Sequence, residues 1–236
     1  MAIRPEVETR FLPATAVRAD ALDNSGPVFS GMSPPWDSWS EDLGFRERFM
    51  PGAFRDLLMD PALDVVATWQ HDSDFPLGRT GNKTLTLEET GVGLEWRAVP
   101  IWPSDRVADY AAQVRGGYVV GTSFAFSQSD PKNEVWGMNG DELTRTILRA
   151  TGLYDTAIVT HPAYADSKVG LRRRDAWAAQ HLSDRERCRI RERDLDRRSD
   201  RAAAAPKPFT ILPHRGAMVR AAAAAARLAM SSRGNP

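Results

Sequence analysis

A chain of 236 residues, 42% of them hydrophobic, is long enough to bury one core and to carry an appendage. The single cysteine excludes an internal disulfide, and neither a signal-peptide pattern nor a run of about 18 apolar residues is present, so we expect a soluble protein of a reducing cytoplasm. The 31 basic and 31 acidic residues cancel overall, yet 16 of the basic and only 7 of the acidic ones lie from Arg172 onward. The charge distribution predicts an acidic body, residues 1–171, and a basic tail, residues 172–236.

Short apolar runs with period-two alternation fill the body, and Gly, Pro, Asn or Asp interrupt them repeatedly. This pattern predicts a mainly β domain, a barrel or sandwich with a few helices. In chain order, the predicted strands are Val65–His71, Lys83–Leu87, Gly93–Val99, Tyr118–Ser127, Thr144–Ala150 and Tyr154–Thr160.

Two helices are predicted between these strands. The segment Gly52–Leu58 has apolar residues at spacings of three and four, and Ser104 is a typical N-cap for a helix over Asp105–Arg115. The segment Asp72–Gly78 is rich in turn-forming residues, so we expect a turn there. The fold class predicted for the body is therefore α+β and mainly β.

The tail differs from the body in composition. Mixed charge is dense from Arg172 to Arg201, and acid–base pairs at helical spacing, such as Asp194 with Arg197, favour a solvated helix. Three prolines then predict a linker, and the alanine-rich run Ala217–Met230 predicts a further helix. We expect a helical or disordered tail, which is either a plain solvated appendage or an arm that delivers the body to a partner.

One predicted strand carries a candidate nucleophile. If Tyr118–Ser127 is extended, its bulky side chains share one face, and the other face bears mostly small residues, including Ser123. The bulky face suits a core, while the small face would leave Ser123 in open space that a substrate could occupy. A serine that merely faces solvent is the alternative interpretation.

A serine needs a base, and the body contains two histidines, His71 and His161. His71 ends a predicted strand, from which it can reach a neighbouring strand, and imidazole accepts a proton near neutral pH. A structural role for this histidine stays open. For the third residue, Asp155 and His161 have the same parity but lie about 20 Å apart on a straight strand, so one must be chosen. We favour Asp155, because a carboxylate flanked by apolar residues needs a partner.

Four segments occur in the order found in the prohead proteases of tailed phages, and over about residues 45–164 the chain resembles that family. The segments are Phe49–Phe54, Trp69–Asp72 with Leu77–Thr80, Gly121–Phe126 and Leu153–Tyr164.

The resemblance implies an assemblin-like β-barrel surrounded by a few helices, with a histidine, a serine and a third catalytic residue in that order. It assigns the first two roles to His71 and Ser123. The position of the family's usual glutamate is occupied by Asp155, whose side chain is one methylene shorter. Assemblins use a second histidine as the third catalytic residue, so His161 is kept as the fallback for this role. Arg149 and nearby backbone amides are candidate oxyanion donors.

The implied function is a serine endopeptidase that cleaves scaffold and major capsid protein segments, and its own chain, inside the immature prohead in the host cytoplasm. The protease would be absent from the mature virion or processed there. A homodimer is open; we expect no cofactor, no metal and no membrane, and no nucleic-acid partner. Two alternatives remain: a metal hydrolase using His71, Asp72 and Asp74, and a non-catalytic scaffold or capsid subunit with a basic interaction tail.

Overall fold

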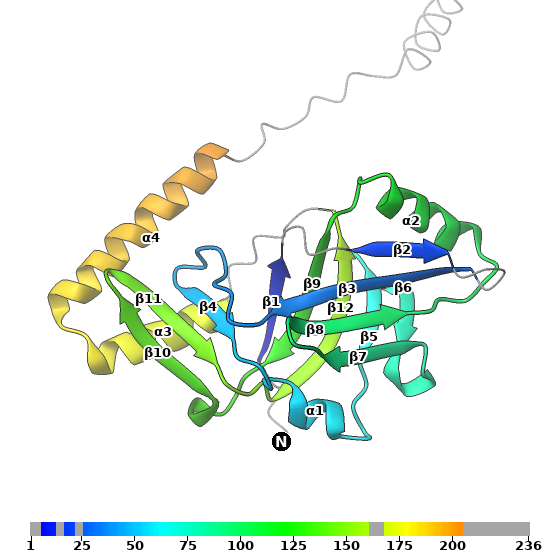
Figure 1. Cartoon of the computed structure of the whole chain (residues 1–236). Helices are drawn as coiled ribbons and strands as arrows, with labels where there is room; N and C mark the ends of the chain where they lie inside the picture. Colours follow the sequence, from blue (N-terminus) through cyan, green and yellow to red (C-terminus); the bar gives the residue numbers. More distant parts are fainter. Residues whose placement is uncertain (1–5, 13–16, 22–25, 161–167, 205–236) are drawn as a thin grey trace, which may run out of the picture. The chain divides into compact units, whose positions relative to one another are not determined.

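The structure is a computed structural model that describes residues 6–12, 17–21, 26–160 and 168–204 (Figure 1). The chain divides into two compact units, Met1–Arg191 and Glu192–Pro236. The strands are β1 (Val7–Leu12), β2 (Arg18–Ala21), β3 (Pro27–Pro35), β4 (Arg46–Phe49), β5 (Val66–Trp69), β6 (Asp72–Arg79), β7 (Leu85–Glu89), β8 (Gly93–Ala98), β9 (Gly121–Ser127), β10 (Glu134–Asn139), β11 (Glu142–Ile147) and β12 (Gly152–Val159). The helices are α1 (Arg55–Met59), α2 (Asp105–Arg115), α3 (Lys168–His181) and α4 (Asp184–Ala204), with 3₁₀ turns η2 (Thr80–Asn82) and η3 (Pro131–Asn133).

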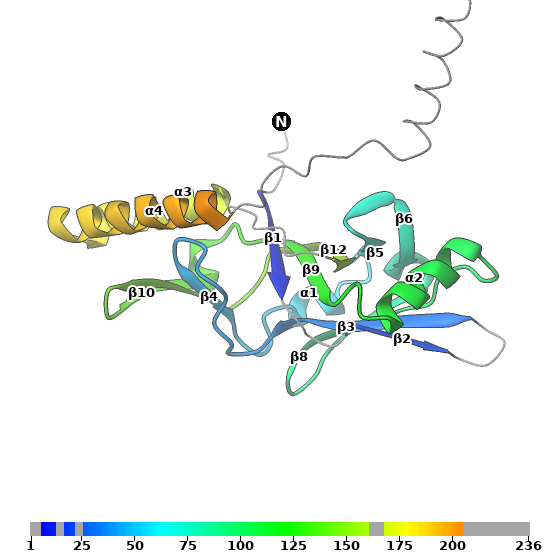
Figure 2. The same ribbon diagram turned by 90° about the horizontal axis from the view of Figure 1, so that it is seen from above.

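The strands of the first unit form three sheets (Figures 1 and 2). The largest has the order β1-β9-β12-β5-β6, and the others are β2-β3-β8-β7 and β10-β11-β4. The predicted α+β class, mainly β, is confirmed. A closed barrel is not found among the described strands, because β1 and β6 each pair with a single neighbour and so remain the edges of the five-stranded sheet.

The core side of β9 agrees with the predicted alternation. Phe124 and Phe126 are fully buried and pack edge-on against Phe49, with ring centroids 5.4 and 5.1 Å away. The face with small residues differs from expectation, because every residue of β9 is buried, Ser123 included. Ser123 therefore does not stand in open space.

The segment predicted as a turn, Asp72–Gly78, is instead part of strand β6. The chain reverses just before it, at Gln70 and His71, whose φ angles are 60° and 58°. Trp69 pairs with Asp72 across this two-residue turn, so β5 and β6 form a tight hairpin with irregular register. Two successive positive φ angles are typical of a type I′ hairpin turn. Because the chain already reverses at these two residues, the segment Asp72–Gly78 extends as a strand and forms no turn of its own.

The helices follow the sequence closely. Ser104 caps α2 as predicted, since its Oγ accepts a hydrogen bond from the amide of Val107 at 3.4 Å. α4 begins with a capping box, in which the Ser183 amide donates to Glu186 Oε2 at 2.8 Å. None of the helices that the structure describes is both long and apolar enough to cross a membrane.

The region predicted as a tail begins with a helix that packs within the first unit. From α3, Arg174 is buried and donates to the carbonyl of Gly44 at 2.9 Å, and Arg173 pairs with Glu134 at 2.8 Å. Within the second unit, Asp194 and Arg197 form the expected ion pair at 3.5 Å. The predicted linker and alanine-rich run lie outside the described residues, and the domain boundary at Leu171 stays a prediction.

Candidate active site

The hairpin between β5 and β6 positions the imidazole of His71. Its turn residues have left-handed backbone conformations, which are unfavourable for side chains other than glycine and need support from their surroundings. That support comes from the end of β12: the Gln70 amide donates to the carbonyl of Ile158 at 2.8 Å, and the Thr160 amide donates to Gln70 Oε1 at 3.2 Å. These bonds hold the turn, and His71 with it, beside β12.

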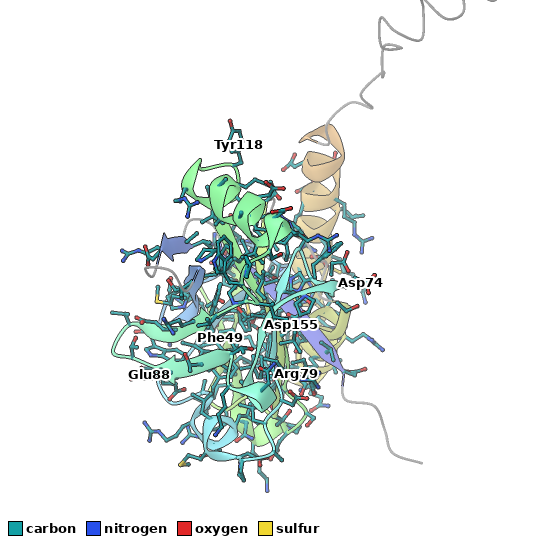
Figure 3. All side chains as sticks on the ribbon, turned by 90° about the vertical axis from the view of Figure 1, so that its right-hand side faces the viewer. Phe49, Asp74, Arg79, Glu88, Tyr118 and Asp155 are labelled. Carbon is teal, nitrogen blue, oxygen red and sulfur yellow. The ribbon has the colours of Figure 1, made fainter. Side chains whose placement is uncertain are left out.

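The pairing of strands brings three predicted residues together. In the five-stranded sheet β12 lies between β9 and β5, so that Ala157 is opposite both Ser123 and Thr68, while Asp155 is opposite Ala125 and Val66. Opposite residues share a face, so Ser123 and Asp155 project from the same side of the sheet as diagonal neighbours. In the view of Figure 3, Asp155 lies between Asp74 and Arg79 of β6.

His71 bridges these two side chains. Its Nδ1 lies 2.9 Å from Asp155 Oδ2, and its Nε2 lies 2.6 Å from Ser123 Oγ. Because a carboxylate can only accept, the Asp155 contact places a proton on Nδ1 and leaves Nε2 of the neutral ring free to accept the proton of Ser123. The arrangement can therefore deprotonate the serine hydroxyl and stabilise the resulting imidazolium.

The hydroxyl of Ser123 has a second acceptor that the sequence did not indicate. The main-chain carbonyl of Arg10, on β1, lies 2.8 Å from Ser123 Oγ. A serine hydroxyl carries one proton, so Arg10 O and His71 Nε2 compete for it when the ring is neutral. When the ring is protonated, both bonds form at once, with Nε2 donating to Oγ and Oγ donating to Arg10 O.

The site is unevenly exposed to solvent. Ser123 is 3% exposed, whereas the side chains of His71 and Asp155 are 26% and 23% exposed. Around the serine, the ring of Phe11 packs so closely on Gly121 that a Cβ there would lie 2.4 Å from it. Access to the nucleophile is therefore narrow on the side of β1.

The other candidate residues lie elsewhere. His161 falls outside the described residues, so the structure does not compare it with Asp155. The guanidinium of Arg149 donates to the carbonyl of Gly52 at 3.1 Å and lies 3.4 Å from Asp56 of α1, which gives it a role in anchoring that helix.

The aspartates considered for a metal site, Asp72 and Asp74, lie at the start of strand β6. Asp72 Oδ1 accepts a hydrogen bond from the Asp74 amide at 2.9 Å, as in an Asx turn. Among the residues that the structure describes, no three His, Cys, Asp or Glu side chains gather closely enough to hold a metal ion.

A cluster of charged side chains lies behind β1, and we call it the buried charge cluster. Arg10 contacts Glu47 and Glu8, each at 2.6 Å, and Arg145 contacts Glu47 at 2.8 Å and Glu134 at 2.6 Å. The cluster joins β1 to β4, β10 and β11. The side chains that each of these strands contributes to it are buried or nearly so. It thereby fixes the strand whose carbonyl meets Ser123.

Ion pairing dominates the electrostatics of this cluster. Burial alone would raise the pKa of Glu8, but the neighbouring guanidinium groups of Arg10 and Arg145 outweigh it and lower the pKa from 4.5 to about 2. Burial likewise opposes the charged form of Arg10, yet Glu47 and Glu8 raise the pKa of its guanidinium. Ion pairing thus favours the charged forms of Glu8 and Arg10.

Comparison with known proteins identifies the family. Residues 14–181 match the model of the family described as Caudovirus prohead serine protease. The chain belongs to this family. As a prohead serine protease it is a peptidase of phage capsid maturation, and the resemblance seen in the sequence is confirmed. The matched residues include His71, Ser123 and Asp155, and they extend to the end of α3.

A search of solved structures finds the capsid assembly protease gp21 of bacteriophage T4. This match has a TM-score of 0.36 and 10% sequence identity, and it covers 64% of this chain and 99% of that one. No curated protein sequence is significantly similar to the chain.

Proposed function

We propose that this prohead protease is an endopeptidase in which Ser123 is the nucleophile, His71 the general base and Asp155 the residue that orients His71. The observation that carries the proposal is the unbroken path of hydrogen bonds from Asp155 Oδ2 through both ring nitrogens of His71 to Ser123 Oγ, with distances of 2.9 and 2.6 Å. Hydrogen bonding between nucleophile and base, and between base and orienting group, is the arrangement that activates a serine.

The chemistry follows from this path. Ser123 Oγ attacks the carbonyl carbon of the peptide bond as its proton passes to His71 Nε2, which forms a tetrahedral intermediate. His71 then returns the proton to the leaving amine, the C–N bond breaks, and an acyl-enzyme remains on Ser123. A water molecule, deprotonated by His71, hydrolyses this ester and restores the serine. Asp155 stays ionised throughout and stabilises the imidazolium.

The proposed aspartate is a departure from the glutamate usual in the family, and the position of the β5–β6 turn supports a role for the shorter side chain. The two-residue turn is bonded to the end of β12, which brings the ring close to the strand that carries Asp155. The distance of 2.9 Å between His71 Nδ1 and Asp155 Oδ2 is that of a charge-assisted hydrogen bond. This contact supports Asp155 rather than His161 in the third role.

We further propose that the substrates are segments of the scaffold and major capsid protein within the prohead, together with the chain's own tail between Arg172 and Pro213. Family membership supports the first part. The tail's Pro206, Pro208 and Pro213 support the second part, because proline-rich segments outside regular secondary structure are usual sites of proteolytic cleavage.

The test is to co-express the chain with the capsid and scaffold proteins of its phage and to map the cleavage sites by mass spectrometry. We expect sites in those proteins and in the tail that disappear with Ser123→Ala. Ser33→Ala is the matched control, because Ser33 is equally buried, lies on β3 and has a side-chain oxygen without a hydrogen-bond partner in the described part of the chain. Cleavage that persists in Ser123→Ala, or proheads that mature normally with it, would favour the non-catalytic scaffold.

A further inference from the structure

A cavity of about 630 Å³ lies beside the candidate active site and shares two residues with it, His71 and Asp155. We call it the triad-side cavity. Its volume is in the range of roughly 300–1,000 Å³ that is usual for sites of small ligands. Apolar residues of β5 and of the segment after β8 form much of its wall, namely Val66, Val99, Pro100 and Ile101.

The register of the sheet gives the distance of this cavity from the nucleophile. Ser123 is on β9, and the cavity lies over β5 and β6, with Val66 directly opposite Asp155 on the same face. Neighbouring strands are about 4.8 Å apart, so β5 is about 10 Å from β9. An extended peptide advances about 3.3 Å per residue, so a substrate held at Ser123 would reach the cavity with a side chain about three residues from the scissile bond.

The charges around the triad-side cavity are already compensated. Arg79 lines the cavity, but its Nε donates to Asp64 at 2.7 Å, and Asp155 is bonded to His71. A charged side chain entering the cavity would therefore lose water and meet charged wall groups, Arg79 and Asp155, that already bond to other side chains. An apolar side chain loses nothing and gains burial against Val66 and Ile101.

Two further features indicate that this space is used by a ligand. Ile101 is 87% exposed, which places a large apolar side chain in the wall with little protein covering it. In the same wall, Thr68 Oγ1 and Asp155 Oδ1 are buried and have no hydrogen-bond partner within the described residues.

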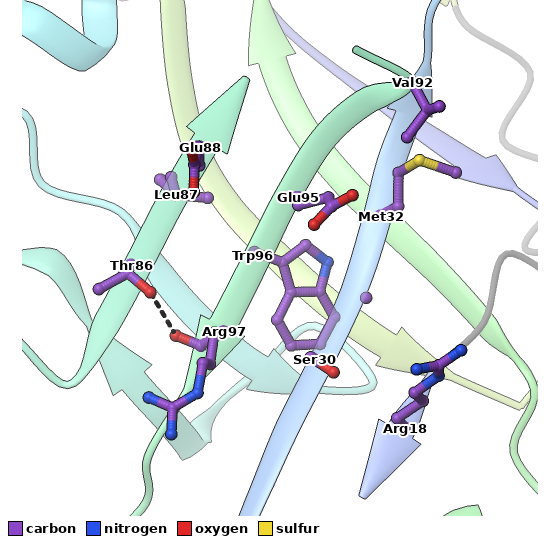
Figure 4. Close-up of a pocket in the computed structure, with 11 residues that line it drawn as sticks. Arg18, Ser30, Met32, Thr86, Leu87, Glu88, Val92, Glu95, Trp96 and Arg97 are labelled. Atoms are coloured by element: carbon purple, nitrogen blue, oxygen red, sulfur yellow. Dashed lines mark hydrogen bonds between the residues drawn. The ribbon is translucent and has the colours of Figure 1, made fainter. Parts of the chain in front are cut away.

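A second cavity, of about 590 Å³, lacks these properties. It lies over the sheet β2-β3-β8-β7 and is lined by Arg18, Glu88, Glu95 and Arg97 among others, as Figure 4 shows. Its described lining contains none of the three candidate catalytic residues, and its charged groups are of both signs. It serves as a comparison for the triad-side cavity.

We propose that the triad-side cavity is a substrate subsite that receives an uncharged, apolar side chain about three residues from the bond that is cut. Ile101 and Val66 are the residues that determine this specificity. The proposal rests on the proposed function, because it takes Ser123 as the point of attack.

The test measures cleavage of a positional-scanning library of fluorogenic peptides by the full-length wild-type protein and two variants. Wild type should prefer apolar residues at one position about three residues from the cleaved bond. Ile101→Asp should lower kcat/KM for these peptides about tenfold and raise it for lysine or arginine at that position, while Val66→Ala should shift the preference toward larger apolar residues. The control is Val92→Asp, which changes an exposed apolar residue of the second cavity and should leave the preference unchanged.

A second measurement separates the subsite from the chemistry. Immobilised Ser123→Ala protein is used to select binders from the same peptide library, with and without Ile101→Asp. If the double variant no longer selects peptides with an apolar residue at that position, the subsite is supported, whether or not the protein cleaves peptides. If no protein of the series cleaves a peptide, the proposed function is rejected and the subsite is judged from binding alone. Normal cleavage and binding with unchanged preference in Ile101→Asp and Val66→Ala would overturn the subsite and leave the proposed function standing.

Discussion

The buried charge cluster and the candidate active site are both built from ionisable side chains on neighbouring strands. Only in the cluster is every charged side chain buried and paired with an opposite charge. In the cluster, Arg145 contacts Glu8, Glu47 and Glu134, so each buried charge faces an opposite one. In the site, the path runs in one direction, from Asp155 through His71 to Ser123, and its middle member is partly exposed. Compensated burial holds charges in place, whereas an open path allows a proton to move.

The two regions meet at β1. The side chain of Arg10 belongs to the cluster, and its main-chain carbonyl accepts a hydrogen bond from Ser123. The comparison therefore predicts that changes in the site alter catalysis and spare stability, while changes in the cluster alter stability first.

Loss of the nucleophile or the base should have the largest effect. Ser123→Ala and His71→Ala should each lower kcat by roughly 10⁵- to 10⁶-fold, because the two residues act as a unit. Thermal unfolding should show that both variants stay folded, since neither side chain supports the core. Turnover on a capsid-derived peptide within tenfold of wild type, in either variant, would remove that residue from the mechanism.

The orienting carboxylate should matter less than the nucleophile. Asp155→Asn should lower kcat by about 10⁴-fold, because an amide no longer holds the proton on His71 Nδ1 or stabilises the imidazolium. The same assay on His161→Ala discriminates the fallback. If His161→Ala is crippled and Asp155→Asn retains activity, the third role belongs to the histidine.

Opening the buried charge cluster should cost stability. Arg145→Met leaves three carboxylates without this partner, and we expect the free energy of unfolding to fall by about 3–5 kcal/mol in urea titrations. Arg46→Met is the control, since the pair of Arg46 with Glu142 at 3.0 Å is partly exposed and should contribute about 1 kcal/mol or less. Equal losses in the two variants would contradict the contrast between closed burial and surface pairing.

Acid should weaken the cluster through Glu8. The pKa of this carboxylate is lowered from 4.5 to about 2, so its contribution is fully present above pH 4.5 and is lost as the pH falls from 4.5 toward 2. The contribution amounts to about 3 kcal/mol. Urea titrations at several pH values should show a shallower acid loss in Glu8→Gln than in wild type, and parallel curves for the two proteins would refute the assignment.

Much of the frame of this protein could be predicted from local patterns. The N-cap role of Ser104 and the burial of the bulky strand face at Phe124 depend only on nearby residues in the sequence. Both predictions are confirmed. Strand β1 was missed because Glu8 and Arg10 interrupt its alternation with charges that become acceptable only beside Glu47 and Arg145, which are distant in sequence. The turn at Gln70 and His71 was missed because neither residue type signals a positive φ.

The site shows the same limit. The sequence offered Ser123, His71 and Asp155 as candidates through the order of motifs and the chemistry of the side chains, but no pattern gives the distances between residues on different strands. The carbonyl of Arg10 had no signal at all, because every residue carries a main-chain carbonyl and only the pairing of β1 with β9 selects this one.

Active-site labelling examines whether the hydrogen-bonded path from Asp155 through His71 activates Ser123. The full-length protein is treated with a fluorophosphonate, and the modified residue is identified by peptide mass spectrometry. We expect one dominant adduct on Ser123 that is absent from His71→Ala, while Ser33→Ala labels like wild type. A folded protein that labels on another serine, or that labels Ser123 equally well without His71, would contradict this expectation.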